Sequence, residues 1–178
     1  MRSPNYADLH PRFAWMRDYL HRVAPPGLLP GRQHIDPVAL RAILPFVNLV
    51  DVERGEHDAL RFRYRLIGTL QTTAAGREIS GKYLEDAVAP TFADRIRANM
   101  TAVVQQAKPV YDRFPMPYAD RNFIDSERVY FPLARDGRTV DMLLILNFYP
   151  DEEIAQPARE EDSSQTAAPR PFPLHDRS

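Results

Sequence analysis

The longest apolar stretch of the chain lies late in the sequence, between residues 139 and 149. Residues 142–146 are five consecutive apolar residues, so both faces of an extended segment there would be apolar. The stretch is too short to cross a bilayer, which takes about 20 apolar residues. Gly137 precedes it and Pro150 follows it, and both residue types end regular structure. The pattern predicts a central strand that is covered on both sides.

Two other segments have the pattern of edge strands. Along residues 60–68, arginines alternate with apolar residues, and a row of charge on one strand face discourages pairing with another chain. Residues 110–118 contain Pro115 and Pro117, which lack the N–H group that a sheet hydrogen bond needs. The buried face of the first segment is then expected to consist of Leu60, Phe62, Tyr64 and Leu66.

Residues 46–52 and 127–134 are predicted as the two remaining strands, and the turn at 135–137 joins the last two strands. With two edge strands and one central strand assigned, the strand order 2-1-5-4-3 satisfies every constraint. The fold class is therefore α+β, a five-stranded antiparallel sheet with a long helix on one face and an N-terminal helix.

The long helix is predicted over residues 91–108, with Thr91 as its N-cap and Pro109 after its end. Phe92, Ile96, Met100 and Val103 form its buried stripe. Short helices are expected over residues 38–44 and between Gly68 and Gly76.

The N-terminal helix is predicted over residues 6–23, with its regular part starting near Leu9 because Pro11 suits only a first turn. Its apolar residues are spaced by three and four, and Trp15 and Tyr19 lie off that stripe. The helix with Phe13, Trp15 and Tyr19 is the candidate interface of a homodimer. Packing of the same aromatic residues on their own domain is the alternative.

Composition favours one globular domain with tails, since 44% of the 178 residues are apolar and the net charge is −1. We divide the chain into an N-terminal helix and break (1–27), a domain (28–150) and an acidic, proline-rich tail (151–178). The tail carries a net charge of −4, from seven acids and three arginines, and its composition is typical of disorder. Its Pro171–Leu174 segment is either a docking motif or a passive end.

Several function classes are disfavoured. The chain has no cysteine, which excludes disulfides, thiolate metal sites and cysteine-linked chromophores. The five histidines show no metal-ligand spacing, and no glycine-rich phosphate loop occurs. Balanced charge speaks against nucleic-acid binding, and no segment suggests a membrane partner. The N-terminus lacks the apolar core of a signal peptide, so we expect a cytoplasmic protein.

Three sets of short segments stand out within residues 28–150. They are residues 29–32, 35–37 and 44–45, then 63–69 and 76–81, then 127–129, 132–133 and 136–137. Together these segments resemble the PAS_5 family of bacterial PAS-like proteins, and the element order is also similar to that of a PAS domain. The resemblance implies a non-enzymatic sensory module that binds a small ligand, a signalling partner protein, or both.

No cofactor is predicted. PAS-like haem sensors usually carry a histidine ligand on the long helix, and residues 91–108 contain none. A candidate ligand cavity is expected between the sheet and the long helix, where Tyr64 and Asn147 would supply polar groups within apolar surroundings. Plain core is the alternative for each lining residue. The expected lining consists of Phe62, Tyr64, Leu66, Ile96, Met100, Val103, Met142, Leu144 and Asn147.

Two other functions are compatible with the residues. A curved sheet with a helix can also form the cone-shaped pocket of a small-molecule isomerase or lyase, in which Asp112 and Tyr64 would act together. A structural adaptor with a filled core and no ligand is the other possibility. A carboxylate of raised pKa in a deep pocket would favour the enzyme, and a fully packed interior would favour the adaptor.

Overall fold

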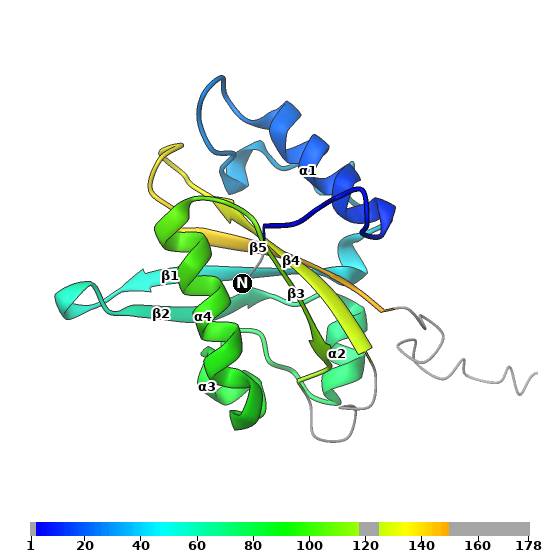
Figure 1. Ribbon diagram of the computed structural model, residues 1–178. Coiled ribbons are helices and arrows are strands. Elements are labelled where there is room, and N and C mark those ends of the chain that lie inside the picture. The colour runs from blue at the N-terminus through cyan, green and yellow to red at the C-terminus, as the bar shows by residue number, and fades with distance from the viewer. Residues whose placement is uncertain (1–2, 118–124, 150–178) are drawn as a thin grey trace, which may run out of the picture.

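The computed structural model describes residues 3–117 and 125–149. The acidic tail predicted from residue 151 onward lies outside the described residues. These residues form one five-stranded sheet with helices on both sides (Figure 1).

The sheet has the predicted strand order, β2-β1-β5-β4-β3, and every neighbouring pair is antiparallel. The central strand is β5, and its residues 142–147 are all buried. The arginine-rich β2 and the proline-containing β3 are the two edges, as predicted. The strands are β1 (Val47–Arg54), β2 (Leu60–Leu66), β3 (Val110–Pro115), β4 (Asp125–Leu133) and β5 (Met142–Phe148).

The long helix begins one residue earlier than its predicted cap. Pro90 is the first helical residue and Ala89 the N-cap, so Thr91 does not cap the helix. Proline suits this position because its missing N–H would have no partner there. The described helices are α1 (Pro11–Val23), α2 (Thr69–Ala75), α3 (Leu84–Ala87) and α4 (Pro90–Gln106).

The prediction of a helix over residues 38–44 is wrong. The backbone there forms a series of turns, in which Leu40 N donates to Pro37 O at 3.2 Å and Arg41 N to Val38 O at 3.3 Å. A short 3₁₀ turn, Leu44–Phe46, then leads into β1. Seven residues between two prolines are too few to hold a regular helix without support from packing. The short helix before Gly76 is present, and that glycine ends it with φ 62°.

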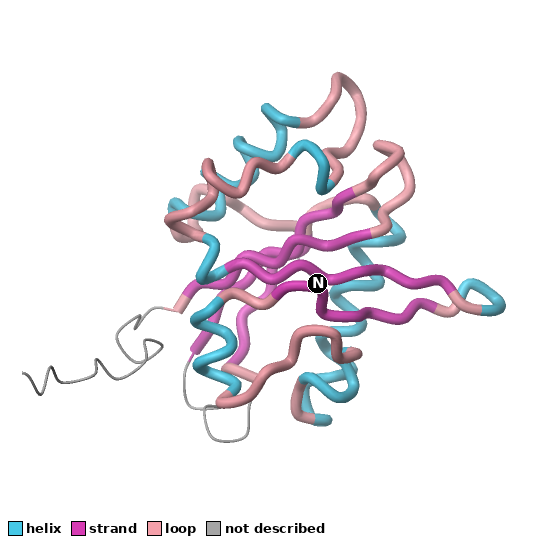
Figure 2. The backbone as a smooth tube through the Cα atoms, turned by 180° about the vertical axis from the view of Figure 1, so that it is seen from behind, coloured by secondary structure: helices cyan, strands magenta, loops and turns pink. Residues whose placement is uncertain are grey.

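The two faces of the sheet are covered by different helices (Figures 1 and 2). On one side, which we call the α1 face, the Phe148 ring stacks on His10 at 3.9 Å and meets Phe13 edge-on at 6.5 Å. On the other side, the α4 face, Ile96 of α4 and Ile145 of β5 line the same cavity. Neighbouring residues of β5 therefore face different helices.

A β-bulge in β2 overturns the predicted alternation of that strand. Val50 pairs with Tyr64 but Leu49 pairs with Leu66, so Arg65 is an extra residue with no residue opposite it in β1. An extra residue shifts every later side chain to the opposite face. Leu66 consequently lies on the α1 face with Leu49 and is 40% exposed.

The sheet register also corrects the predicted placement of two central-strand residues. Met142 is opposite Asp51 and Leu144 opposite Leu49, so both lie on the α1 face. Asn147, an odd number of positions away, lies on the α4 face with Arg128 as its partner in β4. Met142 and Leu144 are buried, but on the side of the sheet away from α4.

The N-terminal helix docks on its own domain. Phe13 and Tyr19 are buried, and the Tyr19 hydroxyl accepts a 2.9 Å hydrogen bond from the backbone N of Asp36. Tyr19 therefore does not lie off the buried stripe. Trp15 stacks on Tyr19 at 5.5 Å and is 45% exposed, so it alone of the three predicted interface residues presents a large surface.

Candidate functional site

A small cavity lies between the α4 face of the sheet and α4. Its volume is about 20 Å³, room for about one water molecule. Six of its nine lining residues carry polar side-chain atoms, which is unusual for the interior of a sheet. The lining consists of Asn48, Tyr64, Gln71, Ile96, Pro117, Arg128, Tyr130, Ile145 and Asn147.

Two buried asparagines hold the chain beside this cavity. The Asn48 Oδ1 accepts a 3.2 Å hydrogen bond from Gly68 N, and the Asn147 Nδ2 donates to Phe46 O at 2.9 Å. Gly68 is required there because a Cβ would lie 2.2 Å from the Pro45 carbonyl oxygen. The asparagines thus fasten β1 and β5 to the loops that close one end of the sheet.

Arg128 of β4 is a buried cation in this lining, only 4% exposed. One Nη2 hydrogen bond goes to the Ser126 hydroxyl, and the guanidinium lies 3.6 Å from the centroid of the Phe114 ring. Its Nη1 makes no hydrogen bond. Because an arginine in a protein does not lose its proton, this charge is permanent.

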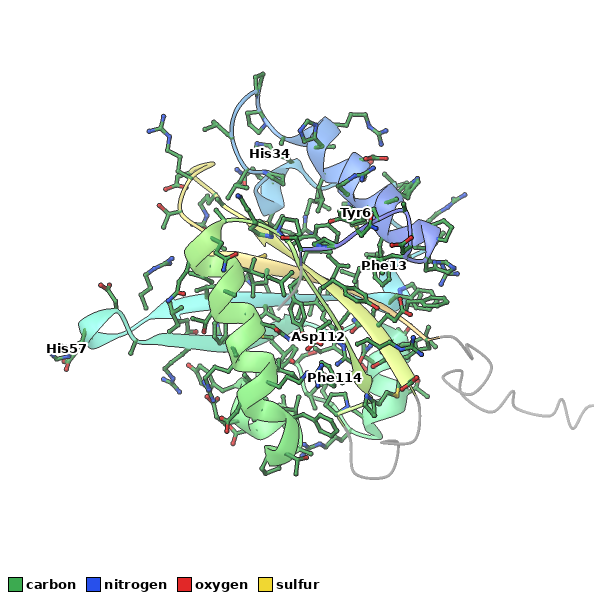
Figure 3. All side chains as sticks on the ribbon, in the orientation of Figure 1. Tyr6, Phe13, His34, His57, Asp112 and Phe114 are labelled. Atoms are coloured by element: carbon green, nitrogen blue, oxygen red, sulfur yellow. The ribbon has the colours of Figure 1, made fainter. Side chains whose placement is uncertain are left out.

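The carboxylate directly opposite Arg128 in the sheet is engaged by other residues. Asp112 of β3 accepts two hydrogen bonds from Arg95 at 2.8 and 2.5 Å and one from Asn99 at 2.6 Å, both from α4. Figure 3 shows Asp112 and Phe114 on β3 beside that helix. Burial alone would raise the pKa of Asp112, but these hydrogen bonds outweigh it and the pKa lies below its ordinary value.

The other charged side chains near Arg128 are paired with one another. Arg95 and Asp112 neutralise each other, while Asp125 and Glu127 lie beside Arg113. None of the described residues places a carboxylate within 4.0 Å of the Arg128 guanidinium.

Tyr130 adds a second buried polar group next to Arg128. Its hydroxyl faces Asn99 and Arg128 but makes no hydrogen bond of normal geometry with either. Burial raises the pKa of Tyr130, with the nearby Arg128 lowering it in part. The phenol thus keeps its proton and remains an O–H donor on a residue that lines the cavity.

Three of the nine residues predicted to line a cavity do so, namely Tyr64, Ile96 and Asn147. Phe62, Met100 and Val103 are fully buried core beside it and are absent from its lining. Leu66, Met142 and Leu144 lie on the α1 face, as described above.

Sequence reasoning missed Asn48, Gln71, Arg128 and Tyr130. A usable signal was present for two of them, because Asn48 and Arg128 are polar residues in the middle of strands predicted to lie inside the sheet. Such strands are covered on both faces, so a polar side chain there needs a specific reason.

The Asp112–Tyr64 pair considered for an enzyme does not assemble. Asp112 lies on β3 and Tyr64 on β2, the two opposite edges of the sheet, with three strands between them. A carboxylate whose pKa is lowered by an arginine is also a poor general base near neutral pH.

In the part of the chain that the structure describes, no group of three or more histidine or acidic residues is arranged to hold a metal ion. Across the same residues, none of the helices combines the length and apolarity that a membrane span requires.

Comparison with solved structures returns PAS domains and sensory proteins. The PAS domain of a protein from Colwellia psychrerythraea is 16% identical, with a TM-score of 0.42, and the match covers 64% of this chain and 97% of that one. A sensory box sensor histidine kinase from Vibrio cholerae is 13% identical, with a TM-score of 0.36 and coverage of 63% and 87%. An RNA-binding light-oxygen-voltage receptor is 16% identical, with a TM-score of 0.43 and coverage of 75% and 39%.

No curated protein matches this chain. A family model does match, that of the PAS domain family PAS_5, and it aligns with residues 9–146. The aligned segment begins just before α1 and ends within β5, so it includes the N-terminal helix, most of the sheet and every cavity-lining residue except Asn147. Because the match spans well over half of the sequence, the chain belongs to the PAS_5 family of PAS domains.

Proposed function

We propose that this protein is a non-enzymatic sensory module that binds a small polar ligand in the cavity between its sheet and α4. Membership of a PAS family supports the sensory class. The single observation that supports ligand binding is Arg128, a buried cation at the cavity wall with an unpaired Nη1 and no carboxylate of the described residues beside it.

The physical reason lies in the cost of buried charge. Removing an ion from water costs several kcal/mol, which only a well-placed counter-charge and hydrogen bonds offset. The Phe114 ring and the Ser126 hydroxyl offset part of that cost for Arg128. A polar ligand in the cavity that Arg128 lines would supply the partner that Nη1 lacks.

Such a module passes its signal on by binding a signalling partner protein or a second copy of the chain. We expect a homodimer, as proposed from the sequence, with Trp15 as the exposed aromatic residue of α1.

A second candidate function is the structural adaptor without a ligand. The volume of the cavity, about 20 Å³, favours it, since that space holds about one water molecule and the surrounding core is closely packed.

Native mass spectrometry of freshly purified full-length protein, together with a small-molecule thermal-shift screen, separates the two candidates. The sensory module predicts a retained small molecule or a compound that raises the melting temperature. It also predicts loss of that effect in Tyr64→Phe or Asn147→Ala, which alter the cavity wall. A mass equal to that of the bare chain and no stabilising compound would support the adaptor.

A further inference from the structure

We propose that the ligand of this cavity is a small carboxylate, of one or two carbon atoms, whose carboxylate group binds to Arg128 and Tyr130. The inference rests on the proposed ligand-binding function and specifies its chemistry. It follows from the charge, the free donor atoms and the size of the site.

Charge argues for an anion. The Arg128 side chain is 4% exposed, and the one carboxylate opposite it in the sheet, that of Asp112, is held by Arg95 and Asn99 of α4. A ligand that carries a negative charge would supply the counter-charge that the described residues leave out.

Donor geometry argues for a carboxylate. A guanidinium offers parallel N–H groups that match the two oxygens of a carboxylate. The Nη1 of Arg128 is unpaired, and the Tyr130 hydroxyl, which faces the Arg128 side chain, makes no hydrogen bond of normal geometry. Together they present donors from two side chains on one face of β4, two residues apart.

The rest of the wall argues for a ligand that is polar throughout. Asn48, Gln71 and Asn147 surround the same space with carboxamide groups, whereas Ile96 and Ile145 are the apolar contributors from α4 and β5. A long fatty acid would leave these carboxamides facing hydrocarbon, which is unfavourable. The volume of about 20 Å³ holds about one water molecule, so only the smallest carboxylates are candidates, and side chains of the wall must move to admit them.

The test uses the full-length protein and four probes at equal concentration and ionic strength. Sodium formate and sodium acetate are the candidate ligands, sodium chloride is an anion of another shape, and acetamide is a neutral molecule shaped like acetate. The readouts are the shift in melting temperature and the dissociation constant from titration calorimetry. Formate or acetate should raise the melting temperature more than chloride, and acetamide should have no effect.

The variant Arg128→Gln should weaken carboxylate binding by about tenfold or more, the usual loss for a charge-assisted hydrogen bond. Its matched control is Arg113→Gln on the adjacent β3, whose side chain is 54% exposed and pairs with Asp125. That control should bind the carboxylates as the parent does. Should Arg128→Gln fail to fold, Tyr130→Phe keeps the charge and should weaken binding by roughly 2- to 13-fold.

Several outcomes would overturn the proposal. Equal stabilisation by chloride would remove the carboxylate specificity, and equal stabilisation by acetamide would remove the charge. Unchanged affinity in Arg128→Gln would place the ligand elsewhere. A neutral molecule retained in native mass spectrometry would contradict this inference and keep the proposed ligand-binding function, whereas no retained mass with no response to any probe or screened compound would overturn both.

Discussion

In the proposed function, Arg128 serves ligand binding at the expense of stability. Its guanidinium contacts the Ser126 hydroxyl and the Phe114 ring. Arg95, by contrast, donates two hydrogen bonds to the carboxylate of Asp112. Arg95 is paired with a carboxylate and is 52% exposed, whereas Arg128 is buried and keeps one nitrogen without a hydrogen bond.

The first prediction is that Arg128→Met stabilises the ligand-free protein or leaves its stability unchanged. Replacement of a buried ion by an apolar side chain of similar volume removes the desolvation cost, and the free energy of unfolding should rise by up to about 4 kcal/mol. Urea denaturation of the parent and the variant in a buffer without carboxylates measures this. A loss of more than about 2 kcal/mol would mean that the arginine is a structural element of the core.

The second prediction concerns the acid side of the stability profile. The pKa of Asp112 is lowered in the folded protein below its ordinary value of 3.8. A lowered pKa means that the folded state favours the carboxylate, so the stabilising contribution is fully present above pH 3.8 and is lost as the pH falls from there through the folded pKa. Asp112→Asn should therefore lose less stability than the parent over that window.

The measurement is the free energy of unfolding of both proteins at a series of pH values below 5. The control is Asp94→Asn, which removes an exposed carboxylate of the same helix that carries Arg95 and Asn99. The control should keep the acid slope of the parent. If Asp112→Asn keeps that slope as well, the contacts with Arg95 and Asn99 contribute no stability through this carboxylate.

At the scale of the element, β2 illustrates how a single extra residue changes which side chains share a face. Its first residues follow the predicted period of two, with Phe62 and Tyr64 buried on the α4 face. After the bulge at Arg65 the period is broken, and Leu66 emerges beside Leu49 on the other face. A bulge of this kind depends on the partner strand and leaves no mark in the alternation itself.

The third prediction compares two apolar residues that the sequence assigned to the same cavity. Met100 of α4 is fully buried in closely packed core, so Met100→Ala should lower the free energy of unfolding by about 2–5 kcal/mol. Leu66, being 40% exposed on the other face, should cost less than about 1 kcal/mol when changed to alanine. Thermal or urea denaturation of both variants tests the assignment, and equal losses would contradict it.

At the scale of the whole molecule, the sheet separates two layers of different character. On the α4 face lies the polar cavity, and on the α1 face lies the apolar packing of the N-terminal helix around Phe13 and Phe148. Because Phe13 and Tyr19 of α1 are buried against the rest of the domain, only the outer surface of this helix remains for a partner. That surface includes Trp15, which borders a groove of about 410 Å³ against residues 39–43.

The fourth prediction is that Trp15→Glu converts a homodimer to a monomer with only the small loss of stability that follows from removing its stacking on Tyr19. Trp15 is 45% exposed, so a charged residue there would oppose an interface while leaving the core in place. Light scattering at high protein concentration measures the mass, and the melting temperature reports the fold. Phe13→Glu is the contrast, since it should unfold the protein rather than dissociate it.

A dimeric mass retained by Trp15→Glu would exclude this surface as the interface. A parent protein that is monomeric at every concentration would exclude the homodimer itself and leave a separate signalling protein as the partner. Deletion of residues 1–24 does not discriminate between these cases, because it would also uncover the α1 face around Phe148.

By itself, the sequence determined the strand order and the positions of most elements. The apolar run of β5, the arginines of β2 and the prolines of β3 each report a local condition, namely burial on both faces or an unpaired edge, and three such conditions leave one order. The same holds for α4 and for the end of α2 at Gly76, where periodicity and a single glycine suffice.

Only the tertiary structure decided which side chains meet. The register between paired strands places Arg128 beside Asn147, puts Met142 and Leu144 on the α1 face and, through the bulge, moves Leu66 away from Tyr64. Asp112 likewise binds Arg95 instead of Arg128 because α4 packs against this part of the sheet. Local patterns report how buried a residue is, whereas pairing register and helix docking are long-range, and these set the charge of the cavity.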